Sequence, residues 1–347
     1  MVGEIMAKQL EPGSKGARLA QKIYRSSGIE TRFSAIHDLV PGPGERLFFD
    51  ESGQFLSPST KVRNDIYTQN ARPLFSKTAQ DLLDGCAAYE ARDVTHVITV
   101  SCTGFFAPGP DFYVVKDLGL NPSTKRFHIG FMGCYAAFPA LKMAEAFCLA
   151  DSEAVVLVVC LELCSLHLQP SEDIDDIIST SVFADGVGAA LVSARKPETN
   201  QPSLQIESFA STIASDSEAD MAWTIGDHGF DMVLSTYVPR ILEANVGSIV
   251  DGILGDCGLD RAEVDHWAIH PGGRAILDKV ESGLDLPVES LKPSRRILSK
   301  YGNMSSATIL FVIKEMLSSG TVKSGDRMYA MAFGPGLTVE SALFSKI

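Results

Sequence analysis

The sequence of 347 residues lacks the long apolar runs that would place it in a membrane. Its most apolar stretch, Ala154–Leu161, has the length of a β-strand, whereas a membrane-spanning helix needs about 20 consecutive apolar residues. The opening residues Met1–Ile5 do not place a basic segment before an apolar one, so no secretory signal is expected. Seven cysteines, an odd number, in such a chain indicate reduced thiols and a cytoplasmic location rather than a disulfide framework.

Positive charge is also scarce. The chain has 30 Lys and Arg against 43 Asp and Glu, and its formal net charge is −13. This balance disfavours nonspecific binding to nucleic acid, although an anionic small substrate needs only a local basic patch. With 45% apolar residues, the chain can bury a large core, and it is too long for one small domain.

The chain repeats itself at an offset of about 170 residues. The matched elements are the strands Val94–Val100 and Val264–His270, the helices that follow Cys134 and Asn303, and the strands Ala154–Leu161 and Arg327–Phe333. Strands that alternate with helices in this way predict a duplicated α/β unit. We place the boundary within the polar stretch Arg195–Pro202, which gives an N-terminal half of residues 1–198 and a C-terminal half of residues 199–347.

Three short segments, far apart in the chain, each place one reactive side chain beside small residues. They are Gly130–Cys134 (Gly-Phe-Met-Gly-Cys), Trp267–Gly273 (Trp-Ala-Ile-His-Pro-Gly-Gly) and Tyr301–Ser306 (Tyr-Gly-Asn-Met-Ser-Ser). Glycines let the backbone approach a substrate closely, and ligand sites form where the strands of open α/β sheets end. A Cys, a His and an Asn are the groups needed for a thiolate nucleophile and an oxyanion site.

Cys134 has an ordinary structural interpretation as a small buried side chain, which we adopt for Cys86, Cys148 and Cys257. Cys134 differs because it follows a Gly-x-x-Gly turn and begins a helical pattern. Backbone N–H groups and the helix dipole lower a thiol pKa at such a position, and a nearby imidazolium lowers it further. The sequence therefore predicts a thiolate able to act in acyl transfer between thioesters.

His270 is selected from seven histidines because it ends a buried strand and precedes Pro-Gly-Gly. Asn303 has a second interpretation as a helix N-cap, a position where Asn is favoured, and both interpretations can hold together. The N–H donors of His270 and Asn303 would hold an enolate or a tetrahedral oxyanion. A zinc site at Cys160, Cys164 and His167 is disfavoured because the sequence has no second cysteine pair with ligand spacing, and no metal is expected.

Four motifs carry a resemblance to a known family. They are Gly130–Cys134, Ile269–Gly273, Tyr301–Ala307 and Phe333–Glu340, the last reading Phe-Gly-Pro-Gly-Leu-Thr-Val-Glu. Together they resemble the type III polyketide synthases, the chalcone and stilbene synthase-like family, from about Ala17 to the C-terminus. Within that family, Ser165–Pro170 and Ala222–Met232 are most similar to the bacterial alkylresorcinol and alkylpyrone synthases.

The resemblance implies a homodimer of thiolase fold, with duplicated αβαβα layers, and coenzyme A thioesters as substrates with no cofactor. Cys134 would accept an acyl starter, and His270 would form an ion pair with its thiolate. His270 and Asn303 would then stabilise the enolate formed as malonyl-CoA loses carbon dioxide. The extended chain would cyclise to an alkylpyrone or an alkylresorcinol.

The resemblance also implies roles for further residues. Phe183 matches a gatekeeping phenylalanine between a pantetheine tunnel and the inner cavity. The substrate-binding residues are Phe183, Cys102, Cys164, His167, Met232, Ser305, Gly272, Gly273, Gly334, Pro335 and Gly336. For coenzyme A, Lys22 matches a basic family position, and Arg18, Lys22 and Arg25 are spaced to form one basic helix face.

At two positions this sequence differs from the plant members of the family, and these differences bear on the kind of acyl starter. Met232 stands where plant members usually have a second gating phenylalanine, and Ala107 where they have a methionine that reaches into the partner subunit. Together with the small thiols of Cys102 and Cys164, which replace bulkier or more polar residues of plant members, these residues favour a fatty acyl starter and an apolar cavity that opens toward an extra acyl channel. Two alternatives remain: an initiating β-ketoacyl-carrier-protein synthase, and a thiolase-fold scaffold without activity.

Overall fold

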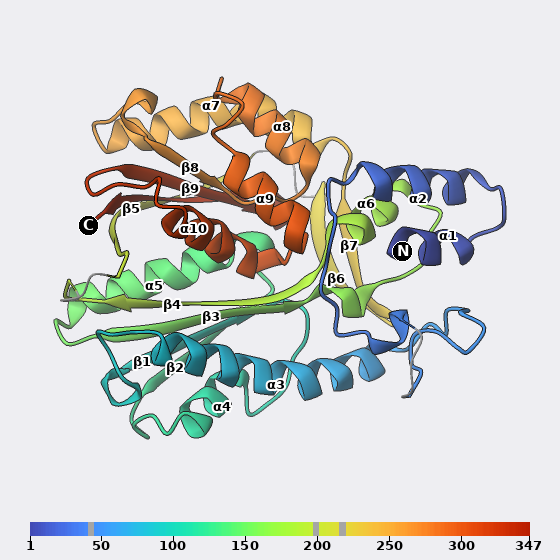
Figure 1. Ribbon diagram of the computed structural model, residues 1–347, viewed down its shortest axis with the longest axis horizontal. Helices are drawn as coiled ribbons and strands as arrows, with labels where there is room; N and C mark the ends of the chain where they lie inside the picture. The colour runs from blue at the N-terminus through green and yellow to red at the C-terminus, as the bar shows by residue number, and fades with distance from the viewer. Residues whose placement is uncertain (41–44, 197–200, 215–219) are drawn as a thin grey trace.

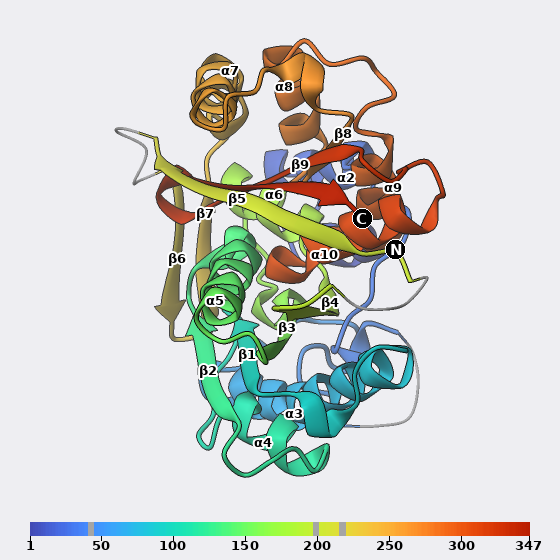
Figure 2. The same cartoon turned by 90° about the vertical axis from the view of Figure 1, so that its left-hand side faces the viewer.

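The computed structural model describes residues 1–40, 45–196, 201–214 and 220–347. Two four-stranded sheets are stacked with helices between them and on both outer faces (Figures 1 and 2). The helical layers are α3 (Thr60–Asp84) with α4 (Pro110–Asp117), α5 (Ala137–Ala150) with α10 (Thr308–Ser318), and α7 (Val238–Asp256) with α8 (Arg274–Gly283). The five layers confirm the predicted αβαβα architecture.

The two sheets share a pattern of three strands. The first sheet has the order β2-β1-β3-β4 and the second has the order β5-β10-β9-β8. In the first, β1 is parallel to β3 and β3 is antiparallel to β4; β8, β9 and β10 repeat these directions. The strands are β1 (His96–Ser101), β2 (Lys125–Gly130), β3 (Val155–Leu163), β4 (Asp185–Ser193), β5 (Leu204–Ile213), β8 (His266–Ile269), β9 (Arg327–Gly334) and β10 (Thr338–Lys346).

Strands β1 and β3 are buried along their whole length. Helix α3 covers one face of β3 and α5 covers the other, so both faces need apolar side chains, as in parallel sheets covered by helices. The buried face of α5 carries Ala137, Ala140 and Ala144, whose small side chains fit the layer between the sheets. The predicted strands therefore lie where the apolar runs indicated, within two residues at each end.

The helices after Cys134 and Asn303 begin later than predicted. Cys134 lies in a 3₁₀ turn, Gly133–Tyr135, and α5 begins only at Ala137. Asn303 precedes a second 3₁₀ turn, Ser305–Ala307, and α10 begins at Thr308. The predicted boundary between residues 198 and 199 lies outside the described residues.

Smaller elements pack at one end of the layered core (Figure 1). They are α1 (Val2–Lys8), α2 (Lys15–Ser26), α6 (Ile174–Val182) and the hairpin of β6 (Met221–Gly226) and β7 (Gly229–Leu234). Helix α9 (Lys292–Tyr301) packs against α10 and α8 instead. Helix α2 packs on α1 and α6, and α6 also contacts β7. This end of the molecule holds the cavities described below.

In the part of the chain that the structure describes, no helix combines the length and apolarity needed to cross a bilayer. The interpretation of three cysteines as buried side chains is wrong for Cys257, which is exposed, while Cys86 and Cys148 are half-buried. Cys257 follows the last turn of α7 at the surface, with its Sγ 3.3 Å from Ser208 Oγ.

Candidate active site

Cys134, His270 and Asn303 line one buried cavity, which we call the inner cavity. Cys134 comes from the turn between β2 and α5, His270 directly follows β8, and Asn303 lies between α9 and α10. Cys134 Sγ lies 3.9 Å from both Oδ1 and Nδ2 of Asn303. The side chains of His270 and Asn303 are each only 1% exposed, so the site is shielded from bulk water.

The turn that carries Cys134 depends on glycine. Gly133 has φ +72°, and a Cβ there would lie 2.5 Å from Cδ of Pro335, which also lines the inner cavity. Phe131 (φ 55°) and Ser305 (φ 47°) also have left-handed backbones. Non-glycine residues rarely adopt this conformation, and it gathers at functional sites.

The Asn303 amide serves two purposes at once. Its Oδ1 accepts a hydrogen bond from Ser305 N (2.9 Å), which caps the following 3₁₀ turn, and Nδ2 donates to Gly272 O (3.2 Å). The second Nδ2 hydrogen is left for the cavity beside Cys134 Sγ. The capping interpretation and the oxyanion interpretation of Asn303 are therefore compatible.

The ionisation of the site differs from the prediction. Burial raises the pKa of Cys134 to about 11, whereas the sequence predicted a lowered thiol pKa. The helix dipole fades within one turn, and Cys134 stands in a 3₁₀ turn before α5 begins. Burial also lowers the pKa of His270 to about 3. A buried thiol and a buried imidazole are thus both neutral when each is considered alone.

Neither ring nitrogen of His270 has a hydrogen-bond partner within the described part of the chain. Buried polar atoms are almost always paired, so such a ring is available to a substrate or to a neighbouring thiol. The inner cavity has a volume of about 40 Å³ and a largely apolar lining. An apolar cavity of about 150 Å³ holds one benzene molecule, so the predicted open acyl channel is absent from the described inner cavity.

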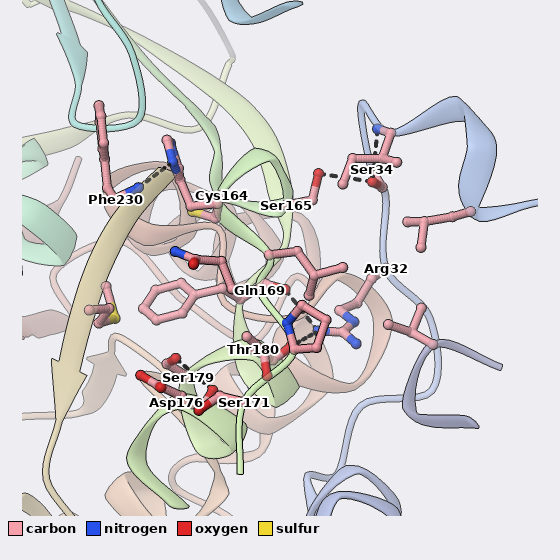
Figure 3. Close-up of a pocket in the computed structure, with 18 of the residues that line it drawn as sticks. Arg32, Ser34, Cys164, Ser165, Gln169, Ser171, Asp176, Ser179, Thr180 and Phe230 are labelled. Carbon is pink, nitrogen blue, oxygen red and sulfur yellow. Dashed lines mark hydrogen bonds between the residues drawn. The ribbon is translucent and has the colours of Figure 1, made fainter. Parts of the chain in front are cut away.

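A second cavity of about 520 Å³, the outer cavity, lies beside the first. Figure 3 shows residues that line it. Residues 32–40, the turn Cys164–His167 and α6 form much of its wall. Phe183, Trp223 and Met232 line both cavities, so these three side chains separate them. Sequence reasoning missed Trp223, whose Nε1 donates to Cys102 O (2.8 Å). The feature of the sequence that could have identified Trp223 is its position within the family-specific segment Ala222–Met232.

The structure places the other predicted substrate residues in three groups. Cys102, Ser305, Gly272 and Pro335 line the inner cavity, together with Phe183 and Met232. Cys164 and His167 line the outer cavity instead. Gly273, Gly334 and Gly336 are backbone positions: a Cβ on Gly334 would lie 2.5 Å from Cδ1 of Tyr135, and Gly336 has φ +69°. Ala107 is exposed on the surface of this chain.

His167 connects two segments beside the cavities, the one that contains Thr103 and the one that contains Phe230. Its Nε2 donates to Thr103 O (2.8 Å), and its Nδ1 accepts from Phe230 N (3.0 Å), which fixes one neutral tautomer. The ring also stacks on Phe230 with centroids 4.1 Å apart. Burial lowers the pKa of His167 to about 3, in keeping with a neutral, positioning side chain.

Sequence reasoning also missed Glu162, a fully buried carboxyl on β3. It accepts hydrogen bonds from Ser306 Oγ (2.6 Å), Cys102 N (3.0 Å) and Thr103 Oγ1 (3.0 Å). Burial raises its pKa to about 7. The signal was one acidic residue within an apolar strand, since carboxyl groups are rarely buried without partners.

Arg18, Lys22 and Arg25 lie together on α2, as predicted from their spacing, and line a surface hollow with Gln21 and Ser26. For metals, the described residues include no group of three or more His, Cys, Asp or Glu side chains able to hold an ion.

A buried thiol, an amide donor and an imidazole without a partner among the described residues, in one cavity of a five-layered α/β fold, are the groups that an acyl-transferring condensing enzyme needs. Sequence profiles of the chalcone and stilbene synthases match this chain in two parts, the N-terminal domain over residues 48–196 and the C-terminal domain over residues 205–347. The chain therefore belongs to the chalcone and stilbene synthase family, the type III polyketide synthases, and is a polyketide synthase, an acyltransferase.

Individual proteins agree with this assignment. The chain is 33% identical over 342 residues to an alpha-pyrone synthesis polyketide synthase-like protein, Pks18, of Mycobacterium tuberculosis, covering 97% of this chain and 84% of the relative. The structure of PKS-I from the brown alga Ectocarpus siliculosus has a TM-score of 0.91 and 30% identity, covering 99% and 93% of the two chains. The 1,3,6,8-tetrahydroxynaphthalene synthase of Streptomyces coelicolor A3(2) has a TM-score of 0.87 and 27% identity, covering 99% and 94%.

Proposed function

We propose that this type III polyketide synthase loads an acyl starter on Cys134, extends it with malonyl units and releases an alkylpyrone. The observation that carries the proposal is the inner cavity itself. It brings the Cys134 thiol within 3.9 Å of the Asn303 amide, beside the His270 ring that has no partner in the described chain. The family supplies coenzyme A thioesters as the substrates.

Loading begins when His270 accepts the proton of Cys134, so that two opposite charges form together in the buried cavity and offset each other's cost. The thiolate attacks the carbonyl carbon of the starter thioester. The bond from that carbon to the coenzyme A sulfur then breaks, and the departing thiolate takes up the proton. The products are an acyl-Cys134 thioester and free coenzyme A.

Extension begins when malonyl-CoA loses carbon dioxide. The electron pair of the broken bond passes to the thioester, and N–H groups of His270 and Asn303 stabilise the enolate oxygen. The carbanion attacks the carbonyl carbon of acyl-Cys134, the bond from that carbon to Sγ breaks, and the Cys134 thiolate leaves, so the chain is two carbons longer and bound to the coenzyme A of the extender. The thiolate takes the chain back by the loading reaction before the second extension. After a second extension, the enol oxygen of the chain attacks its own thioester carbonyl, which closes the pyrone ring and expels coenzyme A.

The pyrone product is supported by the similarity to the mycobacterial alpha-pyrone synthesis protein and by the small inner cavity. A lactone of this kind needs fewer extensions than a resorcinol ring, which remains the alternative product. The apolar lining, with Met232 and Trp223 beside Phe183, supports a fatty acyl starter. Because a fatty chain exceeds the volume of about 40 Å³, Trp223 or Met232 must move, or the chain must pass Phe183 into the outer cavity.

We further propose a homodimer formed through β2. This strand is at the edge of the first sheet and most of its residues are exposed, and an open edge is a template for pairing with another strand. The exposed Phe105 stacks on Phe131, which directly follows β2, at 5.2 Å. On α2, we propose that Arg18, Lys22 and Arg25 bind the phosphates of coenzyme A. We also propose a cytoplasmic location, which the use of coenzyme A thioesters supports.

The test is to incubate the purified protein with malonyl-CoA and acyl-CoA starters from acetyl to decanoyl, and to identify the products by mass. Alkylpyrones from hexanoyl to decanoyl starters, absent with Cys134→Ala, are expected. Preferred use of acetyl or aromatic starters would contradict the fatty acyl assignment, and resorcinols would contradict the ring assignment. Activity with malonyl groups on acyl carrier protein but not on coenzyme A would support the carrier-protein alternative instead.

A further inference from the structure

Residues 30–35, which we call the strap, cross the wall of the outer cavity after α2 ends (Figure 3). At its start, the backbone N–H groups of Glu30 and Thr31 donate to Ser299 O on α9 (2.8 and 3.1 Å), and Thr31 Oγ1 donates to Lys300 O. Helix α9 ends directly before Gly302 and Asn303. The strap is therefore fixed to one side of the loop that carries the Asn303 amide.

The strap is also fixed to the segment that carries Phe183. Nη1 of Arg32 donates to Phe183 O (2.9 Å) and to Thr180 O (3.0 Å), at the C-terminal end of α6. These are carbonyls that a helix end leaves without intrahelical partners, and a cation there is favoured by the helix dipole. A single guanidinium nitrogen thus helps to hold the backbone of Phe183 in place.

Asp185 holds the strap from the other side. Its Oδ2 accepts from Ala35 N (2.6 Å), its Oδ1 accepts from Ser165 N (2.7 Å), and its own N donates to Phe33 O (3.2 Å). Burial raises the pKa of the Asp185 carboxyl to about 6, and the nearby charge of Arg32 partly opposes this rise. We call residues 180–185, which include Phe183, the gate segment. The strap therefore contacts the gate segment at both ends of a four-residue stretch, through Arg32 and through Ala35.

The gate segment is paired directly with the catalytic loop. Asn303 N donates to Val182 O (2.8 Å), and Ala184 N donates to Asn303 O (2.8 Å), so Phe183 and Asn303 form a parallel bridge. A shift of the Phe183 backbone would move the backbone of Asn303 with it. The contacts run from Arg32 through the Phe183 carbonyl to the residue whose amide faces Cys134.

We propose that Arg32 is a positioning residue for the reaction: it sets both the closure between the two cavities and the orientation of the Asn303 amide. The inference rests on the proposed roles of Phe183 and Asn303. Loss of the guanidinium misplaces the Asn303 donor, which slows decarboxylation of malonyl-CoA. It also frees the Phe183 gate, which admits water that hydrolyses the acyl-Cys134 thioester to a free acid.

Arg32 also lines the outer cavity, so direct binding of an anionic substrate is the competing role. Steady-state kinetics separate the two roles. A positioning residue acts on kcat, because the substrate still binds but the oxyanion donor is misplaced. A substrate ligand acts on KM, because uniform binding is lost.

The experiment compares Arg32→Met and Arg32→Lys with Arg296→Met as the control. Arg296 is an exposed arginine on α9 that pairs with Glu315 at 3.0 Å. For each variant, the measurements are kcat and KM for malonyl-CoA decarboxylation, and the ratio of free fatty acid to polyketide. Circular dichroism and thermal melting check that each variant is folded, and Arg32→Lys keeps the test usable if Arg32→Met does not fold.

Arg32→Met is expected to lower kcat about tenfold or more with little change in KM, since misplacement by about 1 Å can cost about a hundredfold. The ratio of free acid to polyketide is expected to rise, with partial recovery in Arg32→Lys and no change in Arg296→Met. A raised KM at unchanged kcat, or unchanged kcat and product ratio, overturns the inference. Asn303→Ala is measured beside them: if it decarboxylates normally, the proposed role of Asn303 itself is wrong.

Discussion

Replacing His270 with alanine tests how the buried thiol of Cys134 becomes a nucleophile. Burial, partly opposed by hydrogen bonds with Ser305 and Asn303, raises the pKa of Cys134 to about 11, so at pH 7, four pH units lower, about one thiol in ten thousand is ionised. Only the thiolate reacts with an alkylating agent at a useful rate. Under the proposed mechanism, His270 accepts the proton in the wild type, and we expect the charged pair to form well below that pKa.

The expected difference is in the pH profile of alkylation. The wild-type rate at Cys134 should change little from pH 6 to pH 8, whereas the rate in His270→Ala should rise about tenfold per pH unit toward pH 11. Iodoacetamide labelling, followed by mass analysis of the Cys134 peptide, measures this site alone. That restriction matters because Cys102 and Cys164 are also buried near the site, with pKa values raised by burial.

His266→Ala is the matched control. His266 lies at the start of the same strand, β8, and its Nε2 contacts Asp326 Oδ2 (2.8 Å) near the surface. This variant should keep the wild-type profile. An unchanged profile in His270→Ala would refute proton transfer to His270, and a wild-type rate that itself rises tenfold per pH unit would refute it as well.

Three further predictions concern residues other than Cys134, His270 and Asn303. Glu162 keeps its proton in the folded state up to about pH 7 but loses it near pH 4.5 when unfolded, so stability falls as pH rises between these values, by about 3 kcal/mol. Urea unfolding at pH 5 and pH 8 should show a smaller difference in Glu162→Gln. Trp223→Ala joins the two cavities, and its kcat/KM across the starter series should shift toward longer chains, by about fourfold per added methylene; an unchanged series would contradict the assigned wall. Lys22→Glu should raise KM for malonyl-CoA at low salt and less so at high salt, unlike Lys61→Glu on α3, where the exposed Lys61 pairs with Asp65.

The core strands could be predicted from the sequence because their environment is simple. Strand β3 is covered by helices on both faces, so its burial appears directly as a run of apolar residues. The duplication was visible for the same reason, since β8 and β9 repeat the surroundings of β1 and β3. The glycine-flanked Cys134, His270 and Asn303 were identifiable because close backbone approach needs glycine.

The pKa of the Cys134 thiol could not be predicted from the sequence. Local sequence placed Cys134 at a helix start, but the 3₁₀ turn and the packing of distant segments bury the thiol and raise its pKa. The separation of the cavities by Trp223 depends on how the β6–β7 hairpin folds over Cys102. The hydrogen bonds from Arg32 join residues 148 and 151 positions apart, and no local pattern reports them.

The most direct test of the account is to load the enzyme with decanoyl-CoA in the absence of malonyl-CoA and to locate the acyl group by peptide mass analysis. The account predicts one acyl group per chain, on the peptide that contains Cys134, and its conversion to an alkylpyrone when malonyl-CoA is added. An acyl group on another cysteine, or one on Cys134 that malonyl-CoA does not discharge, would contradict it.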